Sequence, residues 1–78
     1  MEFKWVGNPE ASQLGQAPGG FFLRIKDCGE GWYCAVFRHG KRVFHSGDAD
    51  ILPLSSDAAR RLCELVVRVE LGRAGHGV

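Results

Sequence analysis

The sequence predicts an α+β fold in which a single C-terminal helix packs on one face of an antiparallel sheet of three to four short strands (β-β-β-β-α). Two features lead to this prediction. Between residues 21 and 46, runs of alternating apolar and polar side chains, typical of strands, are separated by glycine-containing turns. After residue 55 the apolar residues recur every three or four positions, which is the period of a helix. Because the connections are short, neighbouring strands are expected to pair antiparallel.

The size and charge of the chain limit the classes of protein it can be. Its 78 residues suffice for one domain with one core, which we expect at residues 1–72. So small a core has a thin margin of stability, and a homodimer that buries more surface is one expected state. The net charge of +1 at pH 7 excludes a protein dominated by attraction to phosphate, so any basic patch must be local.

The cysteines and the distribution of apolar residues predict a cytoplasmic protein with no membrane partner. The three cysteines follow no disulfide spacing, which favours a reducing compartment. No apolar run is long enough for a signal peptide or a membrane span.

The N-terminal part predicts one strand and a long loop. Residues 2–6 alternate, with Phe3 and Trp5 on one side of a short strand. Residues 7–20 are rich in glycine and proline, and Leu14 is their only bulky apolar residue. We therefore expect residues 7–20 to form a flexible loop.

Three further strands are expected at residues 21–26, 32–38 and 41–46. The loop DCGEG at 27–31 joins the first two of them. His39 and Gly40 form a two-residue hairpin turn between the last two. Residues 47–54 then lead to the helix.

The helix is expected to begin at Ser55 or Ser56, where a serine side chain can cap it, and to end at Gly72. The tail at 73–78 has no periodicity, so we expect it to be disordered. The apolar stripe expected to face the sheet consists of Ala58, Leu62, Leu65, Val66 and Val69. The opposite side is expected to carry a solvated row of charges, Asp57, Arg61, Glu64 and Arg68.

Strand pairing decides which side chains share a face of the sheet. A five-residue loop pairs Lys26 with Trp32, and the two-residue turn pairs Arg38 with Lys41. One face is then almost wholly apolar and is expected to pack on the helix: Phe21, Leu23, Ile25, Tyr33, Ala35, Phe37 and Phe44. The other face mixes aromatic and basic side chains: Phe22, Arg24, Lys26, Trp32, Cys34, Val36, Arg38, Lys41, Val43 and His45.

This second face is the candidate binding surface. Basic side chains attract phosphates and planar rings stack on unpaired bases, a combination typical of single-stranded nucleic-acid binding. A sheet can also lie in the major groove of DNA. The residues expected to contact nucleic acid or another partner are Phe22, Arg24, Lys26, Trp32, Arg38, Lys41 and His45.

The same face also fits a module that binds a protein or a second copy of the chain, through Phe22, Trp32, Val36 and Val43. Two further interpretations need no ligand. The N-terminal segment covers the face, or its lysine and arginine side chains protect an edge strand from pairing. The sequence leaves these alternatives open.

The segment GWYCAVFRHGKRVFHSG, followed after a short link by SSDAARRLCELV, resembles the arm-type DNA-binding domains of phage integrases, which have three strands and a helix. The matching positions are Trp32, Gly40, Lys41, Arg42, Ala58 and Ala59. The resemblance covers roughly half of the chain and implies that a sheet face enters the major groove. The contacts it implies are Arg24, Trp32, Arg38 and Lys41.

No motif for catalysis, a metal ion or a cofactor stands out, so we expect neither an enzyme nor a small-molecule substrate. Cys34 and His45 are expected to be cross-strand neighbours. Two ligands do not make a closed zinc site, and no third group orients the pair as a nucleophile and base. Asp48 and Asp50 lack the further ligands of a calcium loop.

Overall fold

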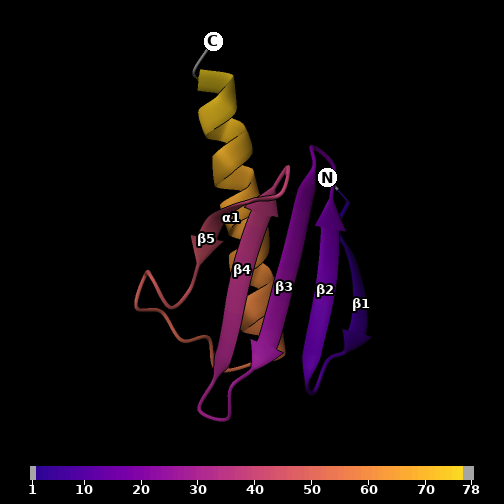
Figure 1. The fold of residues 1–78 in the computed structure, drawn as a ribbon, viewed down its shortest axis with the longest axis vertical. Coiled ribbons are helices and arrows are strands. Elements are labelled where there is room, and N and C mark those ends of the chain that lie inside the picture. Colours follow the sequence, from indigo (N-terminus) through magenta and orange to yellow (C-terminus); the bar gives the residue numbers. More distant parts are fainter. Residues whose placement is uncertain (1, 77–78) are drawn as a thin grey trace.

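Five strands and one helix make up the computed structural model, which describes residues 2–76 (Figure 1). The strands form one antiparallel sheet in the order of the chain. The helix α1 (Ser56–His76) lies on one side of this sheet, mainly against the third and fourth strands. This confirms the predicted α+β fold, with five strands in place of three to four. The strands are β1 (Lys4–Asn8), β2 (Ser12–Ala17), β3 (Phe21–Asp27), β4 (Trp32–Arg38) and β5 (Lys41–His45).

The strand β2 lies where the sequence predicts a flexible loop at 7–20, so that prediction is wrong. The buried positions of β2 are Gln13, Gly15 and Ala17, which give no apolar alternation. A Cβ atom on Gly15 would lie 2.8 Å from the ring of Trp5, so a side chain here would displace the indole. The buried glycine is therefore part of a strand and not the mark of a loop.

The loop between β3 and β4 has four residues, 28–31, and not the five that the sequence suggests. Asp27 pairs with Trp32, and Lys26 with Tyr33. The amide of Cys28 donates to the carbonyl oxygen of residue 31 (2.9 Å), which closes the loop. Because successive side chains of a strand point to opposite sides, this one-residue difference exchanges the two sides of β4.

The exchange places Trp32, Cys34 and Val36 on the helix side, where all three are buried. The sequence assigns these residues to the binding face, and that assignment is wrong. Their place on the far side is taken by the alternate residues of β4, which the sequence assigns to the core: Tyr33, Ala35 and Phe37.

The last residues of β5 lie on the sides of the sheet that the sequence predicts, because a bulge shifts the pairing within this strand. Phe37 pairs with Arg42. Val36, the residue before it, pairs with Phe44, so Val43 is an extra residue in the strand. As predicted, Phe44 packs on the core.

Two local predictions are confirmed. His39 and Gly40 both have positive φ angles, 51° and 82°, which suit a tight hairpin turn. The side chain of Ser55 caps the helix, because its Oγ accepts a hydrogen bond from the amide of Ala58 (3.0 Å).

The C-terminal end of the helix differs from the prediction. Gly72 does not stop α1, which continues to His76. The expected disordered tail is therefore wrong for residues 73–76, and residues 77–78 lie outside the described part of the chain.

The core lies between α1 and the helix side of the sheet. The helix contributes Ala59, Cys63 and Val67, none of which is exposed to solvent. Of the predicted apolar stripe, Leu62 and Val66 are partly buried and pack against this core. The prediction is wrong for Ala58, Leu65 and Val69, which are exposed, the last two by 54% and 49%. Apolar residues occur along both stripes, so the periodicity alone does not choose between them.

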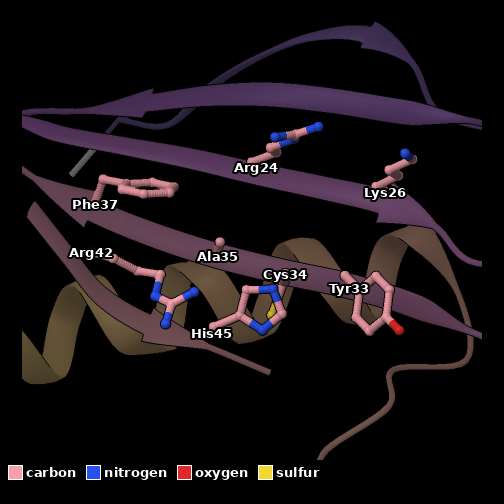
Figure 2. Close-up of a pocket in the computed structure, with 8 residues that line it drawn as sticks. All are labelled: Arg24, Lys26, Tyr33, Cys34, Ala35, Phe37, Arg42 and His45. Carbon is pink, nitrogen blue, oxygen red and sulfur yellow. The ribbon is translucent and has the colours of Figure 1, made fainter. Parts of the chain in front are cut away.

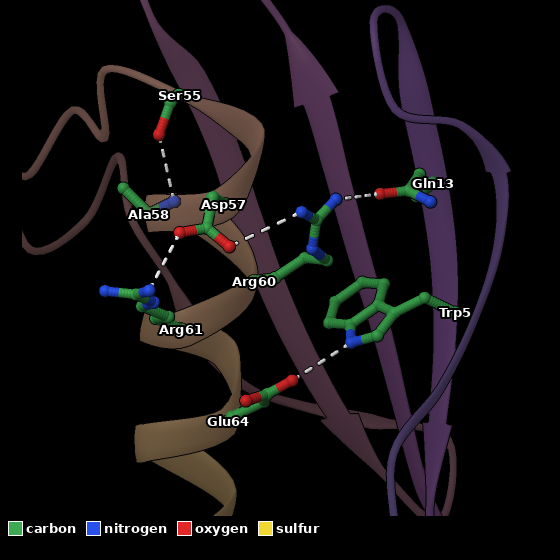
Figure 3. A network of polar contacts seen from close by, with 8 residues as sticks. All are labelled: Trp5, Gln13, Ser55, Asp57, Ala58, Arg60, Arg61 and Glu64. Carbon is green, nitrogen blue, oxygen red and sulfur yellow. Dashed lines mark hydrogen bonds and ion pairs between the residues drawn. The ribbon is translucent and has the colours of Figure 1, made fainter.

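Polar contacts join α1 to the first two strands (Figure 3). Nε1 of Trp5 donates to a carboxylate oxygen of Glu64 (3.2 Å). The guanidinium of Arg60 donates to the side-chain oxygen of Gln13. These contacts hold the edge of the sheet beside the helix and leave the opposite side of the sheet free.

The charged row of the helix is only partly solvated, in contrast to the prediction. The expected pair Asp57–Arg61 forms with an N–O distance of 3.1 Å and is exposed. Glu64 instead accepts the indole hydrogen bond, and the Arg68 guanidinium lies 5.5 Å from the ring centre of Phe3. The latter two contacts fasten the N-terminal segment to the helix.

Candidate nucleic-acid interface

The side of the sheet turned away from α1, here called the open face, is not covered by any described segment. Residues 4–17 do not fold over it, because they form β1 and β2 and widen the sheet. All five strands contribute side chains to the open face: Lys4, Val6, Leu14, Gln16, Phe22, Arg24, Lys26, Tyr33, Ala35, Phe37, Arg42 and His45.

The open face carries cations and, among these strand residues, no carboxylate. Arg24 and Lys26 lie two residues apart on β3, between Lys4 of β1 and Arg42 of β5. Arg42 forms an exposed ion pair with Asp48 (3.2 Å), which adds little stability. No described carboxylate forms an ion pair with the other three cations. Glu2 lines a hollow with Lys4, and Asp48 lies beside Arg42, so both carboxylates border this face at its ends. Positive charge is therefore concentrated at its centre, on Arg24 and Lys26.

Two pairs of rings lie among these cations. The rings of Phe22 and Phe37 have their centres 6.1 Å apart, and those of Tyr33 and His45 lie 5.7 Å apart. Both pairs are tilted, by 54° and 40°, as aromatic pairs prefer. Phe22 and Tyr33 are 39% and 45% exposed, which leaves ring surface available for stacking.

A hollow of about 340 Å³ lies between the rings of Phe37 and Tyr33 (Figure 2). Ala35, in the middle of β4, has the smallest side chain in the hollow and lies at its centre. Cationic and aromatic side chains surround it: Arg24, Lys26, Tyr33, Phe37, Arg42 and His45.

The structure brings together four of the seven predicted contact residues on the open face: Phe22, Arg24, Lys26 and His45. The other three, Trp32, Arg38 and Lys41, lie on the helix side, so their assignment is wrong. Arg38 packs there with its guanidinium 4.8 Å from the ring centre of Phe21, and its Nε donates to Gly19 (3.2 Å). Lys41 is the cross-strand partner of Arg38 and shares its side.

Tyr33, Phe37 and Arg42 are members of the site that the sequence interpretation missed. Both possible registers of the β3–β4 hairpin give β4 an alternating pattern, so alternation could not place the first two residues. Arg42 is opposite Phe37 in the predicted pairing as well, and it follows Phe37 to the open face. A prediction of four residues, in place of five, for the loop between β3 and β4 would have placed all three residues on the open face.

The predicted neighbours Cys34 and His45 lie on opposite sides of the sheet, so they form no pair. His45 is instead opposite Ala35. The Cys34 thiol is buried and contacts the Cys63 thiol of α1. This contact and burial raise the pKa of Cys63, so its thiol stays protonated in the core.

Among the side chains that the structure describes, at residues 2–73, no three of His, Cys, Asp or Glu cluster in a way that could hold a metal ion. No described helix combines the length and the apolar character needed to cross a membrane. No protein-family model matches the chain, and neither the curated proteins nor the solved structures contain a significant match.

Proposed function

We propose that this chain is a small non-catalytic protein that binds single-stranded nucleic acid through the open face. The observation that carries the proposal is the segregation of charge, with cations and ring pairs together on one side and no carboxylate among its strand residues. Cations bind phosphates and exposed rings stack on bases, so the open face can contact both the phosphate and the base of a nucleotide.

A single strand fits this face better than a duplex. Side-chain rings can stack only on bases that are free of their neighbours, and bases inside a duplex are already stacked. Of the residues that the integrase resemblance would place in a DNA groove, Arg24 alone lies on the open face. The groove-binding mode therefore has less support.

The salt dependence of binding to fluorescent oligonucleotides tests the proposal. The association constant for single-stranded DNA or RNA is expected to fall by roughly 20-fold between about 50 and about 200 mM NaCl, as for about three phosphate contacts. Fluorescence anisotropy measures this directly. Absence of binding to either nucleic acid at the lower salt concentration would contradict the proposal.

Two lysines on opposite sides of the sheet provide a matched pair of variants. Lys26→Ala, on the open face, is expected to weaken binding several-fold and to reduce the salt slope by about 0.7. Lys41→Ala removes the same charge from the helix side and is expected to leave both quantities unchanged. Equal losses in the two variants would indicate attraction to net charge and not to this face.

The apolar end of the open face supports a second candidate, a protein contact or homodimer. Val6, Leu14 and Phe22 are 64%, 43% and 39% exposed and surround a separate hollow of about 310 Å³. Neighbouring exposed apolar side chains favour association. A dimer that persists at high salt in analytical ultracentrifugation would support this candidate, and a monomer would argue against the homodimer.

The proposed location is the cytoplasm. Cys28, Cys34 and Cys63 are free thiols, and a reducing compartment keeps thiols in this state.

A further inference from the structure

We infer that the hollow over Ala35 binds one unpaired base of the strand and prefers guanine, thymine and uracil, whose major-groove edge presents a keto oxygen and no amino group. The inference rests on the proposed function and specifies which bases the open face prefers. At about 340 Å³ the hollow is at the small end of ligand pockets, which suits a single nucleotide.

The spacing along β4 leaves room for a planar ring. Tyr33, Ala35 and Phe37 are alternate residues of the strand, so their side chains point to the same side. The backbones at Tyr33 and Phe37 are about 13 Å apart at the rise of an extended strand. Ala35 forms the floor between the two rings (Figure 2), but only 6% of its surface is exposed, so a base above it contacts mainly the side chains around it.

A row of three residues across the sheet sets the width of the hollow. Arg24 of β3 and His45 of β5 are the direct partners of Ala35 on its two sides. At the usual separation of strands, their backbones lie about 10 Å apart. Their side chains flank the floor from opposite edges (Figure 2), so a base on Ala35 has one of them at each edge.

Hydrogen-bond donors dominate the side chains around the floor. The three cations of the hollow can only donate. Nδ1 of His45 accepts a hydrogen bond from the amide of Gly47 (2.9 Å), so the proton of the neutral ring is on Nε2. Among the described side chains that line the hollow, the Tyr33 hydroxyl is the one oxygen or nitrogen acceptor left for a ligand.

The donor side chains around the hollow match a base edge that presents hydrogen-bond acceptors. Arginine pairs with O6 and N7 of guanine through two parallel hydrogen bonds, and the carbonyl oxygens of thymine and uracil are acceptors as well. On this same edge adenine and cytosine present amino groups, which are donors and would face donors, and this leaves polar groups unpaired at the contact. The preference for keto bases follows from this mismatch.

The test varies one base in a labelled single strand. Strands of about nine nucleotides, otherwise cytosine, carry thymine, guanine, adenine, cytosine or an abasic unit at the centre. Thymine and guanine are expected to bind about tenfold more tightly than adenine, cytosine or the abasic unit. Anisotropy of the wild-type protein measures these differences without any variant.

Ala35→Leu fills the hollow and leaves the charge of the open face unchanged. It is expected to abolish the base preference while retaining the salt dependence. The matched control is Gln16→Leu, which adds a leucine on the open face outside the hollow and is expected to keep the preference. Circular dichroism establishes that both variants are folded.

The outcomes separate this inference from the proposed function. Strand binding with normal salt dependence but no base preference would overturn the keto-base site and leave nucleic-acid binding intact. A preference that survives Ala35→Leu would place the base elsewhere and would also overturn the inference. Absence of binding to any strand would instead overturn the proposed function itself.

Discussion

Replacement of Trp32 by alanine is expected to lower the free energy of unfolding by about 3–5 kcal/mol, because the indole is 8% exposed and packs in the core. A domain of this size is stable by only about 4–12 kcal/mol, so the variant is expected to be close to unfolded. Urea unfolding followed by far-UV circular dichroism measures the loss. Fluorescence is less suitable, because Trp5 also contributes to it.

The matched control is Tyr33→Ala at the next residue of β4. Tyr33 is 45% exposed on the open face, so its loss is expected to cost no more than about 1 kcal/mol. The same variant is expected to weaken oligonucleotide binding, because it removes a ring from the hollow. A larger loss of stability for Tyr33→Ala than for Trp32→Ala would mean that the strand has the opposite register.

Val67→Asp is expected to lower the free energy of unfolding by about 3–5 kcal/mol, because it places a carboxylate without a partner in the core. Val67 has no exposed surface and lies between α1 and the sheet. Chemical denaturation of the purified variant measures this loss. The experiment decides which stripe of the helix is buried.

Val69→Asp makes the same substitution two residues further along the helix. Val69 is 49% exposed, so the new carboxylate stays hydrated and the expected loss is below about 1 kcal/mol. The two variants share the same change in helix propensity, and their difference therefore reports burial alone. Equal effects would contradict the position of the helix on the sheet.

Local patterns were sufficient for the elements from residue 21 onward. The run FFLRIK alternates apolar and polar side chains, and the pair His39-Gly40 can adopt the positive φ angles of a tight turn. The serine cap of the helix could be predicted in the same way, because its side chain accepts a hydrogen bond from an amide three residues further along the chain. In each case the interaction that stabilises the element lies within a few residues of sequence.

The strand β2 could not be recognised in this way. Gly15 is buried only because the indole of Trp5 covers it from a neighbouring strand. Gln13 is buried, and its side chain accepts a hydrogen bond from a helix residue far along the chain, Arg60. Contacts between distant segments therefore override the weak strand propensity of these residues.

The sequence predicted the basic and aromatic character of the candidate site, but only some of the residues that form it. Arg24 and Lys26 alternate with apolar residues of the core, so the third strand has one possible arrangement. On the fourth strand both sides carry aromatic residues, and the choice between Trp32 and Tyr33 depended on the length of one loop. That length was not determined by local propensity.

The sequence by itself determined the α+β class, the start of the helix, and a sheet with basic and aromatic residues on the side away from the core. The tertiary structure decided the sides of β4, the face of α1 that is buried and the existence of β2. The physical reason is the same in all three cases. Each alternative satisfies local propensity equally, and only packing between segments distant in the chain separates them in free energy.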